Sequence, residues 1–575
     1  MKAPVVKVDP ALGSVVGAEA VGIAAFAALP TYRFGWWPAT VITVVALVVL
    51  LVTVHRRNVA AWAAARARWM RARRYTTAVG AAFDISHGGE VYGVRTAGNE
   101  AVTVVEVDGR AYSPTFLRGS TVSRTDNVLP LGVLTGLMEQ PGGLLLGIDI
   151  VCTGHRVRPG TGYPQLYSTL LADRGAAGQR TTYLVVRLDI RESTRGLVYR
   201  RSIGSAAAAA TERIINALQQ HDIRAAALGA EQHDAVLDEL SVGLAHPPPR
   251  PVVVDDDIEE TPGRGGQLVG VGGPRRSAAG VAVQATARQR VRPKAEVGWH
   301  TINANPGYVT SYYFSPEDIT ADAFNQMWSL RSDHVVHATM LRTRPGGPVT
   351  VSALVRTTDP RRPEQPPTMF LNPLPGDQYA AALRAAPTSA PALHLPARVL
   401  DRSQDLQIPI GSTGILVGAA LRDDTTGSPE IQRDDLVMWA LTDPQRPTRI
   451  VMDASDFYVR QLLIRAAAAG ERIAIYSYDP RRWYSVSQPN IAVVESGHPA
   501  EFVPTIIVND RPHSAPAAGP GLSSTVITLG HSASDTAPPD ILFEQISQSS
   551  VKITTATRSL DVAMVVFRQE QTWTG

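Results

Sequence analysis

Three short stretches carry residue types that could do chemistry. Asp255-Asp256-Asp257 contains a DxD pattern, and carboxylates at that spacing hold a divalent metal and a sugar nucleotide in membrane-anchored glycosyltransferases. Such a pattern needs a rigid strand end to present its carboxylates. Here it stands between PPPRP and TPGRG, where an acidic run is typically a solvated one. We therefore do not expect a metal site there.

The other two stretches are a pair of histidines and a glycine-containing turn. His334 and His337 form HxxH, but positions three apart on a strand point to opposite faces, so two ordinary histidines are expected rather than a shared metal. Gly411-Ser412-Thr413-Gly414 has the glycines of a tight turn and lacks the lysine of a phosphate loop.

Cys152 is the only cysteine, so an intramolecular disulfide is excluded, and its apolar surroundings predict a small buried hydrophobic side chain. No constellation for catalysis emerges, and the sequence predicts a protein that is not an enzyme, with no cofactor and no metal.

The elements around these stretches begin with an uncharged apolar run, Trp36–Val54. Its 19 residues would span roughly 28 Å as a helix, about the thickness of the hydrocarbon core of a bilayer. Trp36 and Trp37 stand at one end, where interfacial aromatic residues belong. The run predicts a transmembrane helix.

A second apolar run, Leu12–Leu29, carries Glu19 near its middle, and a central charge disfavours insertion by about 2.5–3.5 kcal/mol. Gly13, Gly17 and Gly22 form a stripe of small residues that predicts close packing on another helix. Glu19 would face a partner helix, be held neutral, or lie nearer the interface. A cleaved signal peptide ending at Ala25-Phe26-Ala27 is the rival interpretation, although Glu19 inside its apolar region argues against it.

Arginine is concentrated directly after the second apolar run. Residues 56–75 predict a basic juxtamembrane helix that continues the one before it, with Trp62 and Trp69 on one face. The basic residues either mark a stop-transfer signal or bind lipid headgroups. They are Arg56, Arg57, Arg66, Arg68, Arg71, Arg73 and Arg74. Because Arg33 alone lies between the apolar runs, the positive-inside rule places both termini in the cytoplasm and predicts a multi-pass protein of the inner (plasma) membrane.

The rest of the chain alternates strand and helix patterns and predicts a large mixed α/β cytoplasmic domain after the two-helix transmembrane hairpin (residues 1–55). Residues 76–245 form one α/β region, with helices over 203–220 and 231–240. Residues 246–296, rich in Pro and Gly, predict a disordered linker or insertion. Residues 297–575 form a further α/β region, or one domain together with 76–245. It contains a helix over 456–469 closed by Gly470. A net charge of only +3 gives no reason to expect nucleic-acid binding.

Two segments of this region resemble a known family. IPIGSTGILVGAAL (Ile408–Leu421) and DFYVRQLLIRAAAAGERIAIYS (Asp456–Ser477) are similar to segments of the EccE proteins, components of the type VII (ESX) secretion systems of mycobacteria and related actinobacteria. TTYLVVRLDIRES (Thr181–Ser193) and the stretch Trp299–Phe314 resemble the family as well, as does the order of hairpin, basic exit and α/β body.

The resemblance implies a structural subunit of an inner-membrane translocation complex. Its implied partners are EccB, the ATPase EccC, EccD and the mycosin protease, in a large hetero-oligomeric assembly within the lipid bilayer. Two other functions stay open on the residues alone: a membrane-anchored enzyme of the glycosyltransferase type, and a regulatory module that senses lipid through Arg56–Arg74.

Overall fold

The computed structural model describes most of the chain. The described residues are 6–8, 12–28, 36–54, 58–72, 77–119, 122–158, 171, 174–246, 295–305, 307–389, 393–400, 406–425, 427, 429–495, 500–511, 524–530 and 538–574.

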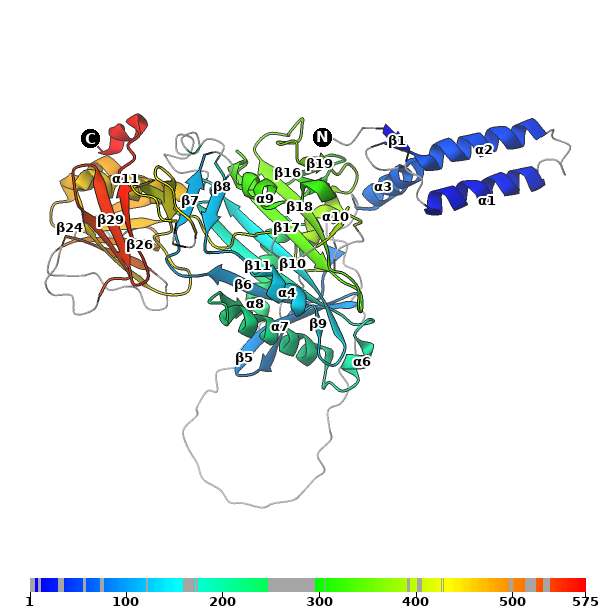
Figure 1. Ribbon diagram of the computed structural model, residues 1–575, viewed down its shortest axis with the longest axis horizontal. Helices are drawn as coiled ribbons and strands as arrows, with labels where there is room; N and C mark the ends of the chain where they lie inside the picture. The colour runs from blue at the N-terminus through cyan, green and yellow to red at the C-terminus, as the bar shows by residue number, and fades with distance from the viewer. Residues whose placement is uncertain are drawn as a thin grey trace, which may run out of the picture.

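A pair of helices, α1 (Leu12–Ala28) and α2 (Trp36–Leu51), projects from the body of the protein (Figure 1). The small residues of α1 face α2, since Gly17 lies beside Leu50 and Gly22 beside Thr43, which makes the two helices antiparallel. The described part of the chain contains no helix that combines the length and the apolar character needed to cross a membrane. Both helices end earlier than the expected limits of 29 and 54.

The predicted continuity between α2 and the basic helix is wrong. Residues Val52–Val54 form strand β2, which pairs antiparallel with β1 (Val6–Val8) so that Val6 is opposite Val54. A separate helix, α3 (Val59–Ala72), follows. Asn58 separates the two helices, because its side-chain oxygen accepts a hydrogen bond from Ala61 N at 2.8 Å while its amide donates to Leu50 O at 3.2 Å. β-branched residues and an N-cap asparagine favour this arrangement over one long helix.

The first of two large sheets has ten strands in its main path, and every neighbouring pair is antiparallel. In spatial order they are β14 (Glu296–Val297), β15 (Ile302–Asn303), β16 (Tyr308–Phe314), β18 (Thr350–Asp359), β17 (His334–Arg342), β10 (Leu144–His155), β11 (Gln179–Asp189), β6 (Glu100–Gly109), β5 (Glu90–Ala97) and β4 (Phe83–His87). Short strands β9 (Glu139–Gln140), β12 (Arg224–Ala227), β19 (Leu371–Pro373) and β20 (Arg398–Val399) pair at its margins. Because β10 lies next to β17, residues on both sides of the segment 246–296 share this sheet.

The strand order of this sheet is two-fold symmetric about the β10–β17 pair. Reading outward, β10, β11, β6, β5 and β4 correspond to β17, β18, β16, β15 and β14. The short strand β12 pairs with β6 as β19 pairs with β16, and each is followed by a helix, α8 (Ala230–Ser241) or α10 (Gln378–Arg384). The sheet is thus an internal repeat of one strand arrangement.

Helices cover both faces of this sheet (Figure 1). On one face α7 (Ile203–Gln219), α9 (Ala321–Gln326) and α4 (Leu131–Gly136) pack on residues such as Ile148 and Val186. On the other face α8 and α10 pack on residues such as Val151 and Val185. The predicted helices over 203–220 and 231–240 are confirmed within one residue at each end. Strand β11, helix α7 and strand β12 form a split strand–helix–strand unit, because β6 lies antiparallel between β11 and β12.

The second sheet has twelve strands. In spatial order they are β25 (Ile491–Val494), β24 (Ile473–Ser477), β26 (Ile506–Asp510), β27 (Thr525–Leu529), β23 (Thr448–Asp453), β28 (Ile541–Gln545), β29 (Ser550–Thr555), β30 (Ser559–Ala563), β21 (Ile415–Ala420), β22 (Leu436–Trp439), β7 (Thr115–Arg118) and β8 (Val122–Thr125). Strands from β25 to β28 are parallel and the others antiparallel.

One helix, α11 (Asp456–Ala469), crosses from β23 to β24 as predicted, and Gly470 ends it with a left-handed φ of 116°. The hairpin β7–β8 comes from the early part of the chain and completes the edge of this second sheet. The chain therefore passes from the first sheet into the hairpin β7–β8 of the second sheet and back again, and strands from both sides of residues 246–296 share the first sheet.

Candidate functional site

The helix that follows the projecting hairpin is fixed to the body by three tryptophans. Trp62 and Trp69 lie seven residues apart on one side of α3, and both contact Trp299, with ring centroids 6.1 and 5.5 Å away. The guanidinium of Arg66 lies 4.3 Å above the Trp69 ring and 5.4 Å from that of Trp299. Such ring pairs stabilise a contact beyond the area they bury. We call Trp62, Trp69 and Trp299 the tryptophan clamp.

The body holds Trp299 in place through its backbone and through a glycine. The amide of Gly376 donates a hydrogen bond to Trp299 O at 2.7 Å. Gly376 has a φ of 79°, and a Cβ added there would come within 2.7 Å of the Trp299 ring. Position 376 thus needs glycine both for its backbone conformation and for the close approach of the ring.

An ion pair accompanies the clamp. Arg68 of α3 donates to Asp377 Oδ1 from Nε at 3.1 Å and from Nη2 at 3.0 Å. The Asp377 side chain is only 5% exposed, whereas that of Arg68 is 48% exposed. Because the Asp377 carboxylate is shielded from water, it depends on this ion pair for its stabilisation more than the half-exposed guanidinium of Arg68 does.

The residues predicted to pack between helices or to contact lipid headgroups have different surroundings in the structure. Gly17 and Gly22 pack on α2, whereas Glu19 is exposed on the outer side of α1, and Gly13 belongs to the first turn of the same helix. Arg66 and Arg68 are engaged with the body, and Arg71 is exposed. Arg56, Arg57, Arg73 and Arg74 lie outside the described residues.

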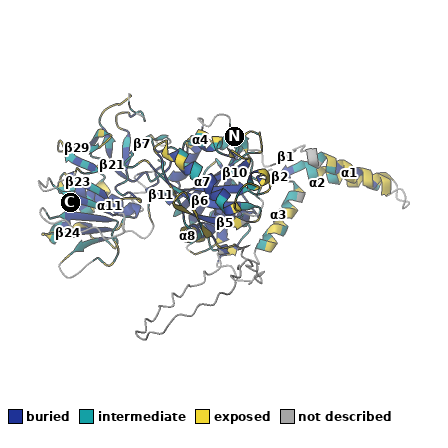
Figure 2. Cartoon of the chain, turned by 90° about the horizontal axis from the view of Figure 1, so that it is seen from below, coloured by how far each residue is buried: buried dark blue, intermediate teal, exposed yellow. Residues whose placement is uncertain are grey.

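The outer faces of the hairpin are apolar and exposed (Figure 2). Trp36 is 72% exposed and Ile23 71%. The same surface includes Val16, Val21, Phe26, Trp37, Val41, Ile42, Val44, Val45, Leu47 and Val48. A contiguous apolar surface of this kind marks contact with a membrane or with another protein.

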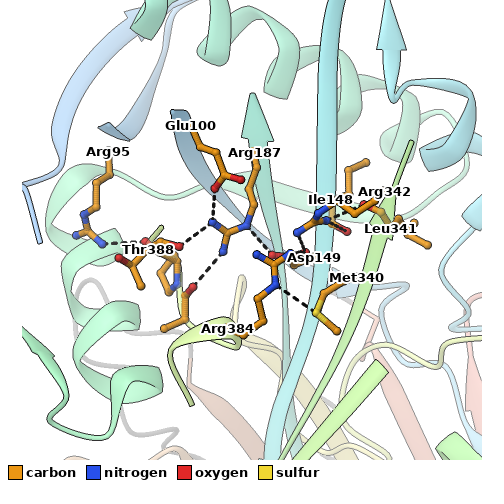
Figure 3. A network of polar contacts seen from close by, with 12 residues as sticks. Arg95, Glu100, Ile148, Asp149, Arg187, Met340, Leu341, Arg342, Arg384 and Thr388 are labelled. Carbon is orange, nitrogen blue, oxygen red and sulfur yellow. Dashed lines mark hydrogen bonds and ion pairs between the residues drawn. The ribbon is translucent and has the colours of Figure 1, made fainter. Parts of the chain in front are cut away.

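A buried ionic network lies on the α8–α10 face of the first sheet (Figure 3). Asp149, fully buried on β10, accepts a hydrogen bond from Arg187 at 2.6 Å and pairs with Arg342, while Arg384 lies 3.5 Å away. Burial raises the pKa of Asp149, but Arg342, Arg384 and Arg187 together hold that pKa below its usual range. Arg187 also donates to Glu100 at 2.9 Å.

The same arginines join the two halves of the repeat. Arg187 of the first half donates to Thr388 O at 2.7 Å and to Ala386 O at 3.2 Å, just beyond α10 of the second half. In return Arg356 of the second half donates to Leu240 O at 2.5 Å, near the end of α8 of the first half. Leu240 O lies in the last turn of α8, where carbonyls lack intrahelical donors, so the second half supplies its donor, and the first half supplies donors to the turn that follows α10.

The histidines of the HxxH pattern and the single cysteine are packed within the first sheet region. His337 is buried against Phe324, with ring centroids 4.2 Å apart, and His334 lies 2.7 Å from Thr153 Oγ1. Burial and Arg180 lower the pKa of His337 to about 3, while burial and Arg356 lower that of His334 to about 4. Cys152 is buried as predicted, and burial raises its pKa.

The turn Gly411–Gly414 serves the contact between the two sheets. Ser412 Oγ accepts from Arg180 N at 3.0 Å, Gly411 O accepts from Arg180 Nε at 2.7 Å, and the amide of Thr413 donates to Ala177 O at 2.9 Å. Within the described residues, no group of three His, Cys, Asp or Glu side chains is arranged to hold a metal ion. The segment with Asp255 and Asp257 lies outside the described residues.

A cavity of about 320 Å³ lies beside this turn, at the junction of the two sheets. It is lined by Glu106 and Asp108 of β6 and by the ion pair of Arg224 with Asp443, 2.7 Å long. Burial and the neighbouring Asp108 raise the pKa of Glu106 to about 7. No local sequence pattern indicates this cavity, because its wall comes from segments more than 200 residues apart along the chain.

The fold and the clamp define a class: an α/β body carrying an apolar helical hairpin, with its candidate site at the attachment of the two. The family model "Putative type VII ESX secretion system translocon, EccE" matches residues 176–262, which include β11, α7, β12 and α8. Over this segment the chain is similar to the EccE family, and over most of its length it is similar to curated EccE proteins.

Three relatives from Mycobacterium tuberculosis span most of the chain. The ESX-2 secretion system protein EccE2 (strain CDC 1551 / Oshkosh) is 26% identical over 83% of this chain and 81% of its own length. The ESX-5 secretion system protein EccE5 (strain ATCC 25618 / H37Rv) is 26% identical over 66% of this chain and 87% of its own. The ESX-1 secretion system protein EccE1 (strain CDC 1551 / Oshkosh) is 26% identical over 76% of this chain and 77% of its own.

Proposed function

We propose that this chain is a structural subunit of a type VII (ESX) secretion complex in the inner membrane, where it supports assembly of the translocation machine and protein export. The observation that carries the proposal is the tryptophan clamp, which ties an apolar hairpin to a large α/β body at a defined angle. The names of the relatives, all of them ESX secretion system proteins, point in the same direction.

The hairpin α1–α2 is the membrane anchor in this proposal. Its outer faces are exposed and apolar, as a lipid-facing surface must be. Pairing of β1 with β2 brings residues 6–8 beside residues 52–54, so the chain enters and leaves the hairpin at the same end. Together with the arginines after α2, this favours a multi-pass arrangement with both termini in the cytoplasm.

Assembly partners would contact the hairpin on faces other than the one between its helices. Gly17 and Gly22 already pack on α2, which leaves Glu19 and the exposed apolar residues for neighbouring helices. EccB, EccC, EccD and the mycosin protease are the proposed partners. Arg71 is free to face lipid headgroups, and Arg56, Arg57, Arg73 and Arg74 are proposed to do the same.

The two alternatives have less support. A membrane-anchored glycosyltransferase would depend on Asp255 and Asp257, and the relatives reported above are secretion-system proteins. A lipid sensor would need Arg66 and Arg68 free to bind headgroups, whereas both are engaged with the body.

Purification from membranes in mild detergent, followed by native-size analysis, tests the proposal. We expect the chain to elute in an assembly far larger than its own 61.6 kDa, together with the other ESX membrane components. Elution alone as a small species with glycosyltransferase activity would contradict it. Exchanging Asp255 and Asp257 for alanine should leave secretion unchanged.

A further inference from the structure

A second surface of the body has the character of a membrane contact. It lies where α6 (Thr194–Leu197) leads into α7, and its most exposed residues are Tyr199 (90%) and Val198 (71%). Ile203, at the start of α7, is 36% exposed, and Phe83 of β4 is 42% exposed. The ring of Phe83 lies against Gly204, so it belongs to the same surface. We call Phe83, Val198, Tyr199 and Ile203, with the arginines around them, the α6–α7 corner.

Arginines surround this apolar group. Residues Asp189–Arg201 contain four arginines, Arg191, Arg195, Arg200 and Arg201, against two acidic residues. Asp189 is occupied within the turn, where it accepts hydrogen bonds from Asn99 at 3.0 Å and from the amide of Arg191 at 2.9 Å. The segment thus carries a net charge of +2, because its four arginines outnumber Asp189 and Glu192 by two.

The corner is built rigidly. Ser193 is fully buried, and its hydroxyl accepts a hydrogen bond from Leu145 N at 2.8 Å. Gly196 lies so close to the backbone of Gly142 and to Leu144 that a Cβ there would clash. The turn is thus anchored to the start of β10, and the exposure of Val198 and Tyr199 does not come from a loose loop. Four apolar side chains held together at the surface mark an interaction site rather than scattered exposure.

The position of the corner identifies its partner. In Figure 1, α6 lies on the side of the body from which α3 and the hairpin project. If the hairpin is in the bilayer, this side faces the cytoplasmic leaflet. Tyrosine favours the headgroup region, and arginine is attracted to the anionic lipids of that leaflet.

We propose that the α6–α7 corner binds the anionic lipid surface, so that the body touches the membrane at a second point beside the hairpin. This inference rests on the proposed placement of the hairpin in the membrane. A second contact would fix the tilt of the body relative to the bilayer more firmly than the hairpin and its tryptophan clamp do alone. Each basic residue near an anionic surface strengthens binding by about fivefold, so three reversed charges should weaken the contact by about 100-fold or more.

The test uses the full-length chain in lipid nanodiscs with a fluorophore on one introduced cysteine. Cys152 is buried and its pKa is raised, so a thiol reagent reaches only the new position. Three labelled variants are compared: Tyr199→Cys in the corner, Tyr478→Cys as a control on the second sheet (67% exposed in the parent), and Val48→Cys in the hairpin. Discs contain phosphatidylcholine alone or mixed with phosphatidylglycerol, each with a headgroup-attached nitroxide quencher.

Quenching at position 199 that requires phosphatidylglycerol, with none at 478, is the expected result. The triple variant Arg195→Glu, Arg200→Glu, Arg201→Glu should abolish it. The matched control Arg422→Glu, Arg433→Glu, Arg481→Glu, three exposed arginines of the second sheet region, should not. If the triple variant fails to fold, Val198→Ser in the Tyr199→Cys chain serves instead, since it removes apolar area without changing charge.

The outcomes separate this inference from the proposed function. A quenched label at 48 with an unquenched label at 199 overturns the second contact and leaves the hairpin in the membrane. An unquenched label at 48 overturns the membrane placement of the hairpin. Quenching of the label at 199 then decides by itself whether the α6–α7 corner binds lipid. A label at 199 that lipid does not quench but that is shielded in the purified secretion complex assigns the corner to a protein partner and overturns the lipid contact.

Discussion

The rings of Trp69 and Trp299 meet almost at right angles, at 88°, with their centroids 5.5 Å apart. One belongs to the helix that follows the hairpin and the other to the first sheet's margin, 230 residues later in the chain. This contact, together with the contact between Trp62 and the same Trp299 ring, fixes α3 and thus the base of the hairpin to the body.

Replacing Trp299 with alanine should release α3 from the body. Each of the two ring contacts contributes about 0.5–1.5 kcal/mol beyond its buried area, so the loss should be at least about 1–3 kcal/mol. Amide hydrogen exchange over residues 59–72 measures it, and protection should fall while β10 and β11 keep theirs. Tyr484→Ala, at an exposed aromatic of the second sheet region, is the control. Unchanged protection of α3 in Trp299→Ala would show that the clamp does not hold the helix.

The pair Arg68–Asp377 should couple energetically across the same contact. A double-mutant cycle with Arg68→Met and Asp377→Asn measures the coupling through the free energy of docking of α3. Because Arg68 is half exposed, water screens the pair, and we expect about 1 kcal/mol, decreasing with added salt. A coupling of zero at low salt would show that the pair does not contribute to the free energy of docking of α3.

Asp149→Asn should destabilise the first sheet strongly. The change leaves the charges of Arg187, Arg342 and Arg384 without their buried counter-ion, and breaking one side of a buried pair costs about 3–5 kcal/mol. Denaturant unfolding measures the loss, with Asp479→Asn at an exposed site as the control. Since the folded pKa of Asp149 is depressed, its contribution is present above the unfolded value of about 3.9 and is lost as pH falls below it. A loss similar to that of the control would refute the structural role assigned to Asp149.

His337 should make the protein less stable in mild acid. Its folded pKa of about 3 lies below the unfolded value of about 6.5, so the unfolded state binds more protons between those limits. Stability is therefore full above about pH 6.5 and falls as pH decreases, by about 2 kcal/mol between pH 7 and pH 5 from this residue. His337→Leu should remove that part of the pH dependence, whereas His394→Leu, at an exposed position, should not. An identical pH profile in parent and His337→Leu would argue against the buried neutral histidine.

Local patterns predicted the helices well. The helix over 456–469 and its closing glycine follow from an apolar period and a C-terminal Gly, both short-range signals. The boundary at Leu51 was missed because it depends on a strand, Val6–Val8, from elsewhere in the chain and on the side chain of Asn58. Apolar valines alone read equally well as helix or strand.

The candidate site was visible only in part. The seven-residue spacing of Trp62 and Trp69 correctly indicated one face of a helix, but it did not indicate that this face packs on Trp299 of the same chain. The internal repeat escaped detection as well. It resides in strand order, and residues such as Arg187 and Arg356 perform equivalent roles without any shared sequence pattern around them. Pairings across hundreds of residues are set by the fold as a whole and leave no local signature.

The reciprocal arginines also have a consequence for synthesis. The acceptor of Arg187, Thr388 O, is made 201 residues later, and the edge of β10 that pairs with β17 at seven positions, Ile148–Gly154, stays open until β17 is made. At a translation rate of about 5–20 residues per second, the delay before Thr388 is made lasts about 10–40 s. Throughout it, the nascent first half exposes a long strand edge and unneutralised buried charge beside the ribosome. Production of this protein should therefore depend on chaperones that act on nascent chains.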